Sequence, residues 1–277
     1  MMYNNIDPKV VNNFGQEWNK FNYRNIDNKN LKKIFNDYFK IFPFKKINKK
    51  SIGFDMGCGS GRWAKFIAPK VKKLNCIEPS NLAIKQAKLN LKAFKNCSFE
   101  KASASKNSLK NNSQDFGYSL GVLHHIPNTL LALQNCTKKL KSGAPFLLYL
   151  YYNFDNKPTW FKIIWKLSDI LRIIICKLPF FLKYPISQFI AFFIYFPTSL
   201  ILKILKKNKI KIKNFPLSYY HDKNFYIMRT DALDRFGTKL EKRYSKKEIQ
   251  TMMTRSQLNN IKFSKKPPYW VAVGTKI

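Results

Sequence analysis

Residues 53–64 read GFDMGCGSGRWA, and this stretch holds four of the ten glycines in the chain. Glycine is needed where the backbone must turn sharply or where a ligand must approach it closely. A short apolar run, SIGFDM at 51–56, precedes the glycines, and a segment with helical spacing follows at 61–71. A strand that leads through a glycine turn into a helix N-terminus is a nucleotide-binding arrangement. The stretch therefore predicts a nucleotide-binding corner in an α/β fold.

Short apolar strands continue to alternate with helices after this corner. Such alternation predicts a parallel sheet that helices cover on both faces. Near the C-terminus, Ser245 and Glu248 form a capping-box pattern that predicts a helix, and two strands joined by a proline turn follow it. Further strands are expected at 73–79, 97–103, 115–123 and 142–152, with helices at 80–94 and 129–141.

The alternation stops at residue 152 and resumes near the end of the chain. Residues 153–230 are rich in aromatic residues and lysine, carry five prolines and show no strand–helix alternation. We therefore expect one α/β domain, formed by 51–152 and 231–277, with a long helical insertion after its fifth strand. Residues 1–50 show helical apolar spacing and predict a helical lid at the N-terminus.

The composition limits the partners and the compartment. The net charge of +36 raises nucleic acid and an anionic membrane surface as partners. The lysines are spread along the chain, however, which favours ordinary surface lysines. The five cysteines have no pair spacing, so we expect neither a disulfide framework nor a metal site. The first residues lack an apolar run of signal-peptide type, so we expect a cytoplasmic protein.

Two nucleotide classes compete for the glycine stretch. Gly59, Gly61 and Ala64 satisfy the G-x-G-x-x-A pattern of dinucleotide-binding proteins. The wider pattern differs, because Asp55 ends the first strand and can face a positively charged group of the ligand. Glu78 ends the second strand, 17 residues after Gly61, where a carboxylate can accept both ribose hydroxyls.

As an ordered set, these motifs resemble the class I S-adenosylmethionine-dependent methyltransferases, in their small-molecule type 11 branch. DMGCGSGRWA, CIEPS and DFGYSLGVLHHIPN, followed by LKSGAPFLLYL, are similar to the successive motifs of that family in order and spacing. The resemblance covers about residues 50–151 and the closing segment 245–277. It implies a Rossmann-like sheet of seven strands, parallel but for one, with S-adenosylmethionine as the cofactor.

The resemblance also implies the residues that hold the cofactor. Asp55, Gly57, Gly59 and Gly61 would cradle its methionine part. Glu78 would hold its ribose.

Four further residues are implied around the adenine and the sulfonium. Ser103 stands where the family often has an aspartate for the adenine amino group, a departure that weakens this contact or leaves it to the backbone. The floor under the sulfonium would be formed by Ser119, Leu120 and Gly121.

Three histidines are candidate general bases for the removal of a proton from the acceptor. His124 and His125 follow the fourth strand, at the edge where open α/β sheets bind ligands, and an imidazole titrates near neutrality. The alternative is that this pair only supports the cofactor loop. His221 lies in the insertion, in the stretch SYYHDKNFYIMRTDALDRFGT at 218–238.

This stretch is predicted to close the acceptor pocket, because it re-enters the domain just before the last helix. The alternative is a surface loop of paired charges. An N-terminal helix adds one more candidate, which lids the cofactor or packs in the core. The predicted pocket residues are Trp18 on that helix and Tyr219, Tyr220, Arg229, Asp231, Asp234 and Arg235 in the insertion.

The insertion also raises a membrane question. Residues 184–202 carry no charge over nineteen positions, which approaches the length of a membrane span. The preceding segment, 160–178, is amphipathic and basic, as are helices that lie in the headgroup layer of an anionic bilayer. Three interpretations stay open: buried helices that wall an acceptor pocket, an interfacial hairpin at the membrane, and a true span.

The sequence thus predicts an S-adenosylmethionine-dependent methyltransferase that acts on a small or lipid-linked acceptor, at oxygen, with peripheral membrane contact. The alternatives are an RNA methyltransferase that uses the basic surface and a cofactor-binding protein without catalysis. Nucleic acid is not favoured, because SLGVLHHIPN differs from the Asn/Asp-Pro-Pro-aromatic loop of base-amino methylation. A Pro-Cys pair for cytosine chemistry is also absent from the sequence.

Overall fold

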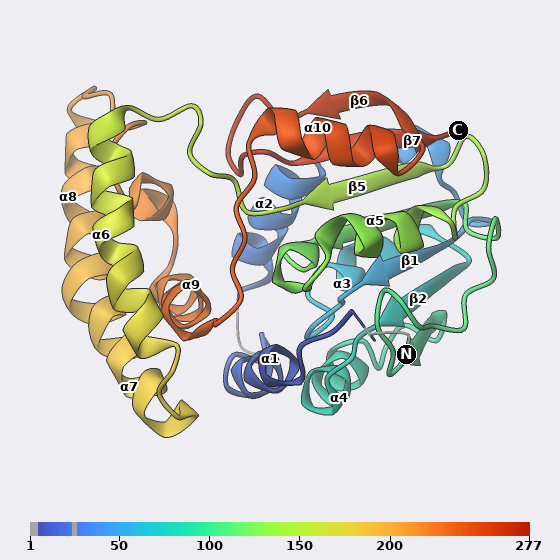
Figure 1. Ribbon diagram of the computed structural model, residues 1–277, viewed down its shortest axis with the longest axis horizontal. Helices are drawn as coiled ribbons and strands as arrows, with labels where there is room; N and C mark the ends of the chain where they lie inside the picture. Colours follow the sequence, from blue (N-terminus) through green and yellow to red (C-terminus); the bar gives the residue numbers. More distant parts are fainter. Residues whose placement is uncertain (1–4, 24–26) are drawn as a thin grey trace. The chain divides into compact units, whose positions relative to one another are not determined.

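The computed structural model describes residues 5–23 and 27–277 (Figure 1). The chain divides into two compact units, which are described separately: unit 1 is Met1–Asn153 with Leu240–Ile277, and unit 2 is Phe154–Lys239. Unit 2 ends nine residues later than the expected insertion, because Phe225–Gly237 forms one continuous helix, α9.

Unit 1 is built on a seven-stranded sheet in the order β3-β2-β1-β4-β5-β7-β6. All neighbouring strands run parallel except in the two pairs that β7 makes with β5 and β6, so the predicted sheet is confirmed. The strands are β1 Ile52–Met56, β2 Lys73–Ile77, β3 Cys97–Glu100, β4 Phe116–Leu120, β5 Pro145–Tyr149, β6 Leu258–Phe263 and β7 Ala272–Lys276.

Polar side chains fix where the helices of unit 1 begin. Asp7, Ser80 and Asn128 accept hydrogen bonds from backbone N–H groups in the first turns of their helices. The predicted capping box of Ser245 and Glu248 is confirmed. The helices are α1 Pro8–Lys20, α2 Asn28–Phe39, α3 Ala64–Ile67, α4 Asn81–Asn90, α5 Thr129–Thr137 and α10 Lys246–Arg255.

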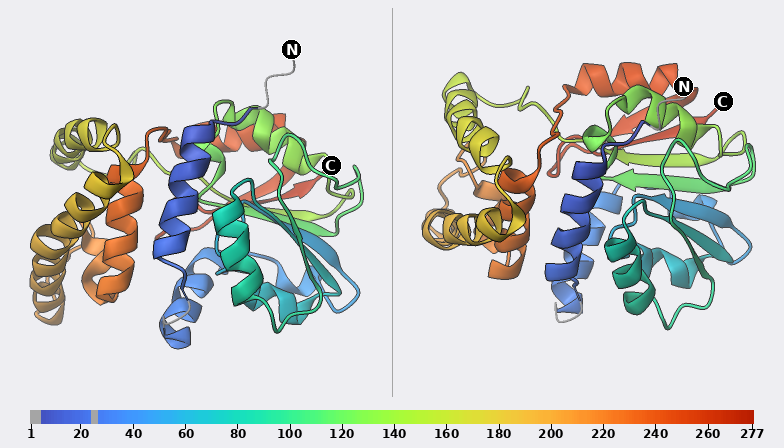
Figure 2. Two further views of the ribbon diagram at one scale, coloured as in Figure 1. Left: turned by 90° about the horizontal axis from the view of Figure 1, so that it is seen from below. Right: turned by 60° about the horizontal axis from the view of Figure 1, so that its bottom comes forward.

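Helices cover both faces of the sheet (Figure 2). On one face, Phe54 and Phe146 pack with Leu133 of α5 and Met253 of α10 in a continuous core. On the other face, Phe39 of α2 lies edge-on against Tyr118, with ring centroids 5.3 Å apart. The central parallel strands end together at one edge of the sheet, and this is the edge where such sheets bind ligands.

Two glycines allow the central strands to pack against each other. Gly53 of β1 pairs with Phe116 of β4, and Phe54 pairs with Gly117. A Cβ atom on Gly53 would lie 2.3 Å from the Phe116 ring, and one on Gly117 would lie 2.4 Å from the Phe54 ring. Each glycine therefore leaves the space that the aromatic ring of the neighbouring strand fills.

Unit 2 consists of helices. Its small core joins Ala191 and Tyr195 to Met228, Ala232 and Phe236 of α9. The helices before α9 are α6 Thr159–Ile175, α7 Phe180–Ile190, a π-helical segment Ala191–Tyr195 and α8 Phe196–Lys207, and a short helical turn, Ser218–Asp222, precedes α9. From Phe180 to Lys207 the helix is continuous over 28 residues, and in the described part of the chain it alone has the length and composition of a membrane span.

The glycine–aromatic pairs predict a specific packing defect. Gly117→Ala should destabilise the protein by about 1–3 kcal/mol, because the new methyl group overlaps the Phe54 ring in a core that cannot expand. Phe54→Leu added to Gly117→Ala should recover part of that loss, since the ring that blocks the methyl group is gone. Urea unfolding of the two single variants and the double variant measures the coupling. Strictly additive effects would contradict the assignment.

Candidate functional site

The loop after β1 turns back on itself through left-handed glycines. Gly57 has φ +76° and Gly59 has φ +54°. A Cβ atom on Gly57 would lie 2.4 Å from Val122, and one on Gly59 would lie 3.0 Å from the Trp18 indole. The N–H groups of Gly57 and Cys58 donate to the carbonyl of Ile77 at 2.8 and 3.1 Å, so the loop is fixed to the end of β2. Larger residues would therefore disrupt both the turn and its surroundings.

Two carboxyl groups are buried at this edge of the sheet. Asp55 lies near the end of β1, Glu78 follows β2, and their exposed fractions are 2% and 6%. The Glu78 carboxylate accepts hydrogen bonds from the N–H groups of Gly59 and Ser80, both at 3.0 Å. The hydrogen bond from Gly59 thereby fixes the glycine loop to the end of β2.

Burial changes the protonation of both groups. It raises the pKa of Asp55 to about 8, although the Tyr118 hydroxyl and Arg62 oppose the shift. It raises the pKa of Glu78 to about 7 against the effect of its two backbone hydrogen bonds. A positively charged ligand beside these carboxyls would favour their ionised forms.

Sequence reasoning missed two residues beside this pair. Tyr118 pairs in register with Asp55, so a correct alignment of β1 with β4 would have found it. Arg62 follows Gly61, and its guanidinium lies 4.9 Å from the Trp18 ring centroid and 4.5 Å from that of Trp63. No sequence signal indicated this stacking, because Trp18 lies far from Arg62 in the chain.

The two neighbouring histidines lie just after β4, on the short helical turn Leu123–His125. Nδ1 of His125 is 2.6 Å from the carbonyl oxygen of Leu240. Since a carbonyl only accepts, Nδ1 carries the proton and Nε2 of the neutral ring carries the lone pair. His124 is fully buried, and burial, then His125 and Arg243, hold its pKa well below the ordinary value.

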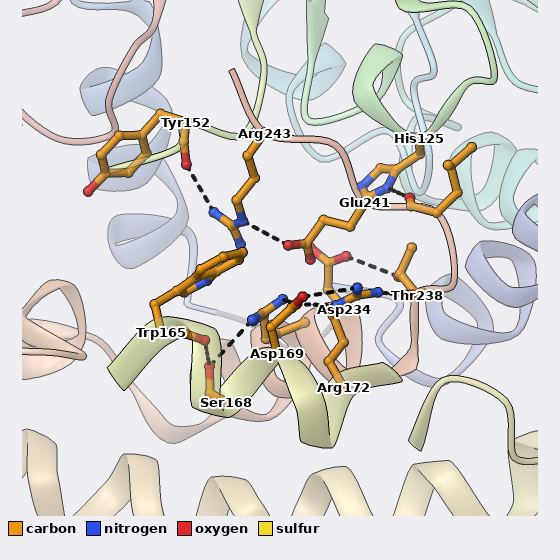
Figure 3. A network of polar contacts seen from close by, with 12 residues as sticks. His125, Tyr152, Trp165, Ser168, Asp169, Arg172, Asp234, Thr238, Glu241 and Arg243 are labelled. Atoms are coloured by element: carbon orange, nitrogen blue, oxygen red, sulfur yellow. Dashed lines mark hydrogen bonds and ion pairs between the residues drawn. The ribbon is translucent and has the colours of Figure 1, made fainter. Parts of the chain in front are cut away.

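Aromatic rings surround the histidine pair. Tyr151 lies 3.9 Å from His124 and 5.4 Å from His125, measured between ring centroids. Arg243 stacks on Tyr151 at 5.1 Å and donates to Glu241 at 2.8 Å and to the Tyr152 carbonyl at 3.2 Å (Figure 3). The edge of the sheet thus offers an aromatic wall that contains the histidine pair.

The helix α1 contacts both parts of this edge. Phe14 and Trp18 lie one helical turn apart, on one face of α1. Phe14 packs on His125 with ring centroids 4.8 Å apart, while the Trp18 indole lies over Gly59. Asn5 and Asn128 exchange two hydrogen bonds, of 2.7 and 2.9 Å, which fix the start of α1 to α5.

The other cofactor candidates lie around the same loop. Ser119 is buried and donates to the Met56 carbonyl at 2.9 Å, so its hydroxyl joins β4 to β1. Leu120 is buried beside it, and a Cβ atom on Gly121 would meet no atom within 4 Å. Ser103 accepts from the Lys106 N–H at 3.1 Å in a local turn.

The candidates in the insertion lie in unit 2 and make contacts within it. Tyr220 donates to Asp231 at 3.0 Å, and the Nδ1 of His221 lies 2.8 Å from the Ser218 carbonyl. The remaining contacts join Arg229 to Gln188 and Tyr184, Arg235 to Asp169, and Asp234 to Thr238, and Figure 3 draws the last of these. Tyr219 packs on Tyr220, with ring centroids 5.2 Å apart. That these residues form an acceptor pocket stays a prediction.

Known proteins resemble this chain in fold. A family model described as a methyltransferase domain matches residues 54–148. No curated protein matches the chain. A methyltransferase from Thermotoga maritima, titled as S-adenosylmethionine-dependent and a possible histamine N-methyltransferase, has a TM-score of 0.51 at 13% identity and covers 97% of this chain and 100% of its own.

Two further solved structures have the same TM-score of 0.51. The YcgJ protein from Bacillus subtilis is 13% identical, and the match covers 86% of this chain and 71% of that one. A putative methyltransferase from Bacillus halodurans is 11% identical and covers 86% and 94%. At such identities these structures support the fold, while the matched domain and the ordered motifs support the activity and the cofactor. Residues 54–148 are therefore a methyltransferase domain, and the chain is an S-adenosylmethionine-dependent methyltransferase with the fold of these solved structures.

Proposed function

We propose that this methyltransferase acts on an oxygen atom of a small or lipid-linked acceptor, and that His125 takes the acceptor's proton. The observation that carries the proposal is the hydrogen bond from Nδ1 of His125 to the Leu240 carbonyl. It fixes the tautomer in which Nε2 can accept a proton, at the edge of the sheet where ligands bind. An acceptor hydroxyl needs such a base when it becomes the nucleophile.

The residues around the glycine loop fit the cofactor. S-adenosylmethionine supplies a methyl group on a sulfonium and carries a cationic amino group. Asp55 offers a buried carboxyl whose ionised form such a cation stabilises, and Glu78 offers a carboxylate beside the loop. Ser60 adds a buried hydroxyl that has no hydrogen-bond partner in the described residues. We assign Asp55, Glu78 and the glycine loop 57–61 to the binding of the cofactor.

The aromatic edge would orient the acceptor and exclude water. Tyr38 of α2 contacts both Tyr149 and Trp63, with ring centroids 5.1 and 5.3 Å apart. The Tyr149 ring in turn packs on the Tyr151 ring, with centroids 6.0 Å apart. Methyl transfer is an in-line displacement, so alignment of the two reacting atoms and exclusion of water supply much of the rate. Rings of this kind favour an apolar or amphiphilic acceptor such as a phenol, a prenylated ring or a lipid-linked sugar.

Replacement of His125 tests the proposed base. Asn places a donor where Nδ1 lies and can keep the Leu240 contact, so His125→Asn removes the base and little else. We expect kcat to fall about 10²–10⁴-fold with unchanged cofactor affinity. The assay follows conversion of isotopically labelled S-adenosylmethionine with lipid and aqueous extracts as acceptor sources, and mass spectrometry of the labelled product identifies the methylated atom.

If His221 were the base instead, the opposite result would be expected. If the base lies in unit 2, His221→Asn abolishes turnover and His125→Asn leaves it intact. Label that enters RNA, or a methylated nitrogen or carbon in the product, would also contradict the proposal.

A matched pair of glutamates tests the cofactor assignment. Glu78 follows β2 and accepts two hydrogen bonds from nearby loops, while Glu100 ends the neighbouring β3 and accepts two from Ser108, at 2.7 and 2.8 Å. Glu78→Ala should weaken S-adenosylhomocysteine binding at least about tenfold, the cost of a lost charged hydrogen bond. Glu100→Ala should leave the affinity unchanged. Calorimetric titration measures both, and equal losses would sink the assignment.

The raised pKa values of Asp55 and Glu78 predict how stability depends on pH. Because both are raised in the folded protein, their contribution to stability is complete below about pH 4 and is lost as pH rises through about 7 and 8. The unfolding free energy of the ligand-free protein should therefore fall between about pH 5 and pH 8. Asp55→Asn should remove the upper part of this fall in urea titrations at several pH values. An unchanged slope would show that Asp55 is not the titrating group.

A further inference from the structure

Exposed apolar side chains are concentrated in unit 2. Of the 24 large apolar side chains that are exposed in the described part of the chain, 20 belong to Phe154–Lys239. Single exposed apolar residues are normal on any protein, but a contiguous apolar surface marks an interaction site.

Helix α6 shows a regular apolar stripe on its exposed side. Its members recur at intervals of three and four residues, which places them on one face of a helix. They are Trp160, Ile163, Leu167, Ile170 and Ile174, and their exposed fractions lie between 45% and 60%.

The long helix Phe180–Lys207 carries a second exposed set. Its aromatic members are Phe189, Phe192, Phe193 and Phe196, and the aliphatic ones include Leu200 and Ile204. We call the exposed sides of α6 and of this helix the apolar face.

Polar groups lie on the opposite, inward sides of the same helices. Arg172 of α6 is buried and donates to the Thr238 carbonyl at 3.1 Å. Lys183 of α7 is buried and donates to the Gly237 carbonyl at 3.1 Å. Both cations thus donate to carbonyl groups at the C-terminal end of α9. Ser187 and Ser199 are buried on the same side of the long helix. Unit 2 therefore buries two cations beside its small apolar core, while many large apolar side chains of α6 and of the long helix stay exposed.

The charge of unit 2 indicates what covers the apolar face. Residues 154–239 hold 16 lysines and arginines against five aspartates and no glutamate. Six of the lysines lie within 203–213, at the end of α8, in a segment without an acidic residue, and all six are exposed. A basic rim beside an apolar face is complementary to anionic lipid headgroups above acyl chains.

We propose that the apolar face of unit 2 docks on the surface of an anionic lipid bilayer, with the 203–213 lysines against the headgroups. A second copy of the chain is a poorer occupant, since two such basic surfaces repel each other. A span fits the long helix Phe180–Lys207 poorly, because one side of it packs on α9 through Ala191 and Tyr195 and its buried Lys183 donates to the Gly237 carbonyl. The docking needs neither the acceptor nor the base and so goes beyond the proposed function.

Flotation of the full chain with vesicles tests the apolar part of the proposal. The probes are phosphatidylcholine vesicles with and without phosphatidylglycerol, at low salt. Wild-type protein should float with the anionic vesicles, and Phe192→Asp with Phe193→Asp should lower the partition coefficient at least about tenfold. Leu89→Asp is the matched control, because Leu89 is an exposed apolar residue of unit 1 (43%) outside the apolar face. It should float like the wild type.

A second pair of variants tests the basic rim. Each lysine near an anionic surface contributes roughly a fivefold factor to affinity. Replacement of Lys207, Lys209 and Lys211 by glutamine should therefore lower binding at least about tenfold. The same replacement at Lys88, Lys92 and Lys95, which are exposed in unit 1, should have little effect. Molar salt should release the wild type in part, since screening removes the charge contribution and leaves the apolar one.

Three results would overturn the proposal. The first is no flotation at low salt. The second is resistance to alkaline carbonate extraction, which would identify a span. The third is a dimer in vesicle-free buffer that Phe192→Asp with Phe193→Asp dissociates, which would assign the face to a second copy. S-adenosylhomocysteine affinity of every variant reports on unit 1 independently, so loss of docking is distinguishable from loss of the methyltransferase site.

Discussion

Burial of two carboxyl groups at the ends of adjacent strands is the constraint on which the active edge depends. Asp55 and Glu78 sit where a carboxylate is costly, and their pKa values rise to about 8 and about 7 as a result. The cost is offset only in part, by the loop N–H groups on Glu78 and by Tyr118 and Arg62 near Asp55. A cationic ligand beside the two carboxyls would stabilise their ionised forms and offset more of this cost. The two buried carboxyls therefore cost stability at this edge, which is common at functional sites.

Much of unit 1 could be predicted because its signals are local. The alternation of apolar strands with helices, the capping box of Ser245 and Glu248, and the spacing from Gly61 to Glu78 can each be recognised in one short stretch. The seven-stranded sheet and the cofactor could be inferred from these signals and their order along the chain. The residue beside Asp55 could not, because Tyr118 lies opposite it only through the register between β1 and β4.

The histidine pair and the insertion show where sequence reasoning stops. Nothing near His125 in the chain indicates that its Nδ1 meets Leu240, a contact across 115 residues. In α6, helical periodicity predicted an amphipathic helix, but periodicity alone does not tell which side faces water. The pattern of Trp160, Ile163 and Leu167 fits a buried stripe as well as an exposed one, and burial of Arg172 decides between them.

Contact of α1 with both halves of the edge has a kinetic consequence. Phe14 touches the histidine side and Trp18 the glycine loop, and one rigid helical turn joins them. A displacement of this turn would uncover the glycine loop and the proposed base together. Exchange of cofactor and exposure of the reaction chamber to bulk water are then one event. In such an arrangement, the position of a single helix would govern both the exchange of the cofactor and the entry of water.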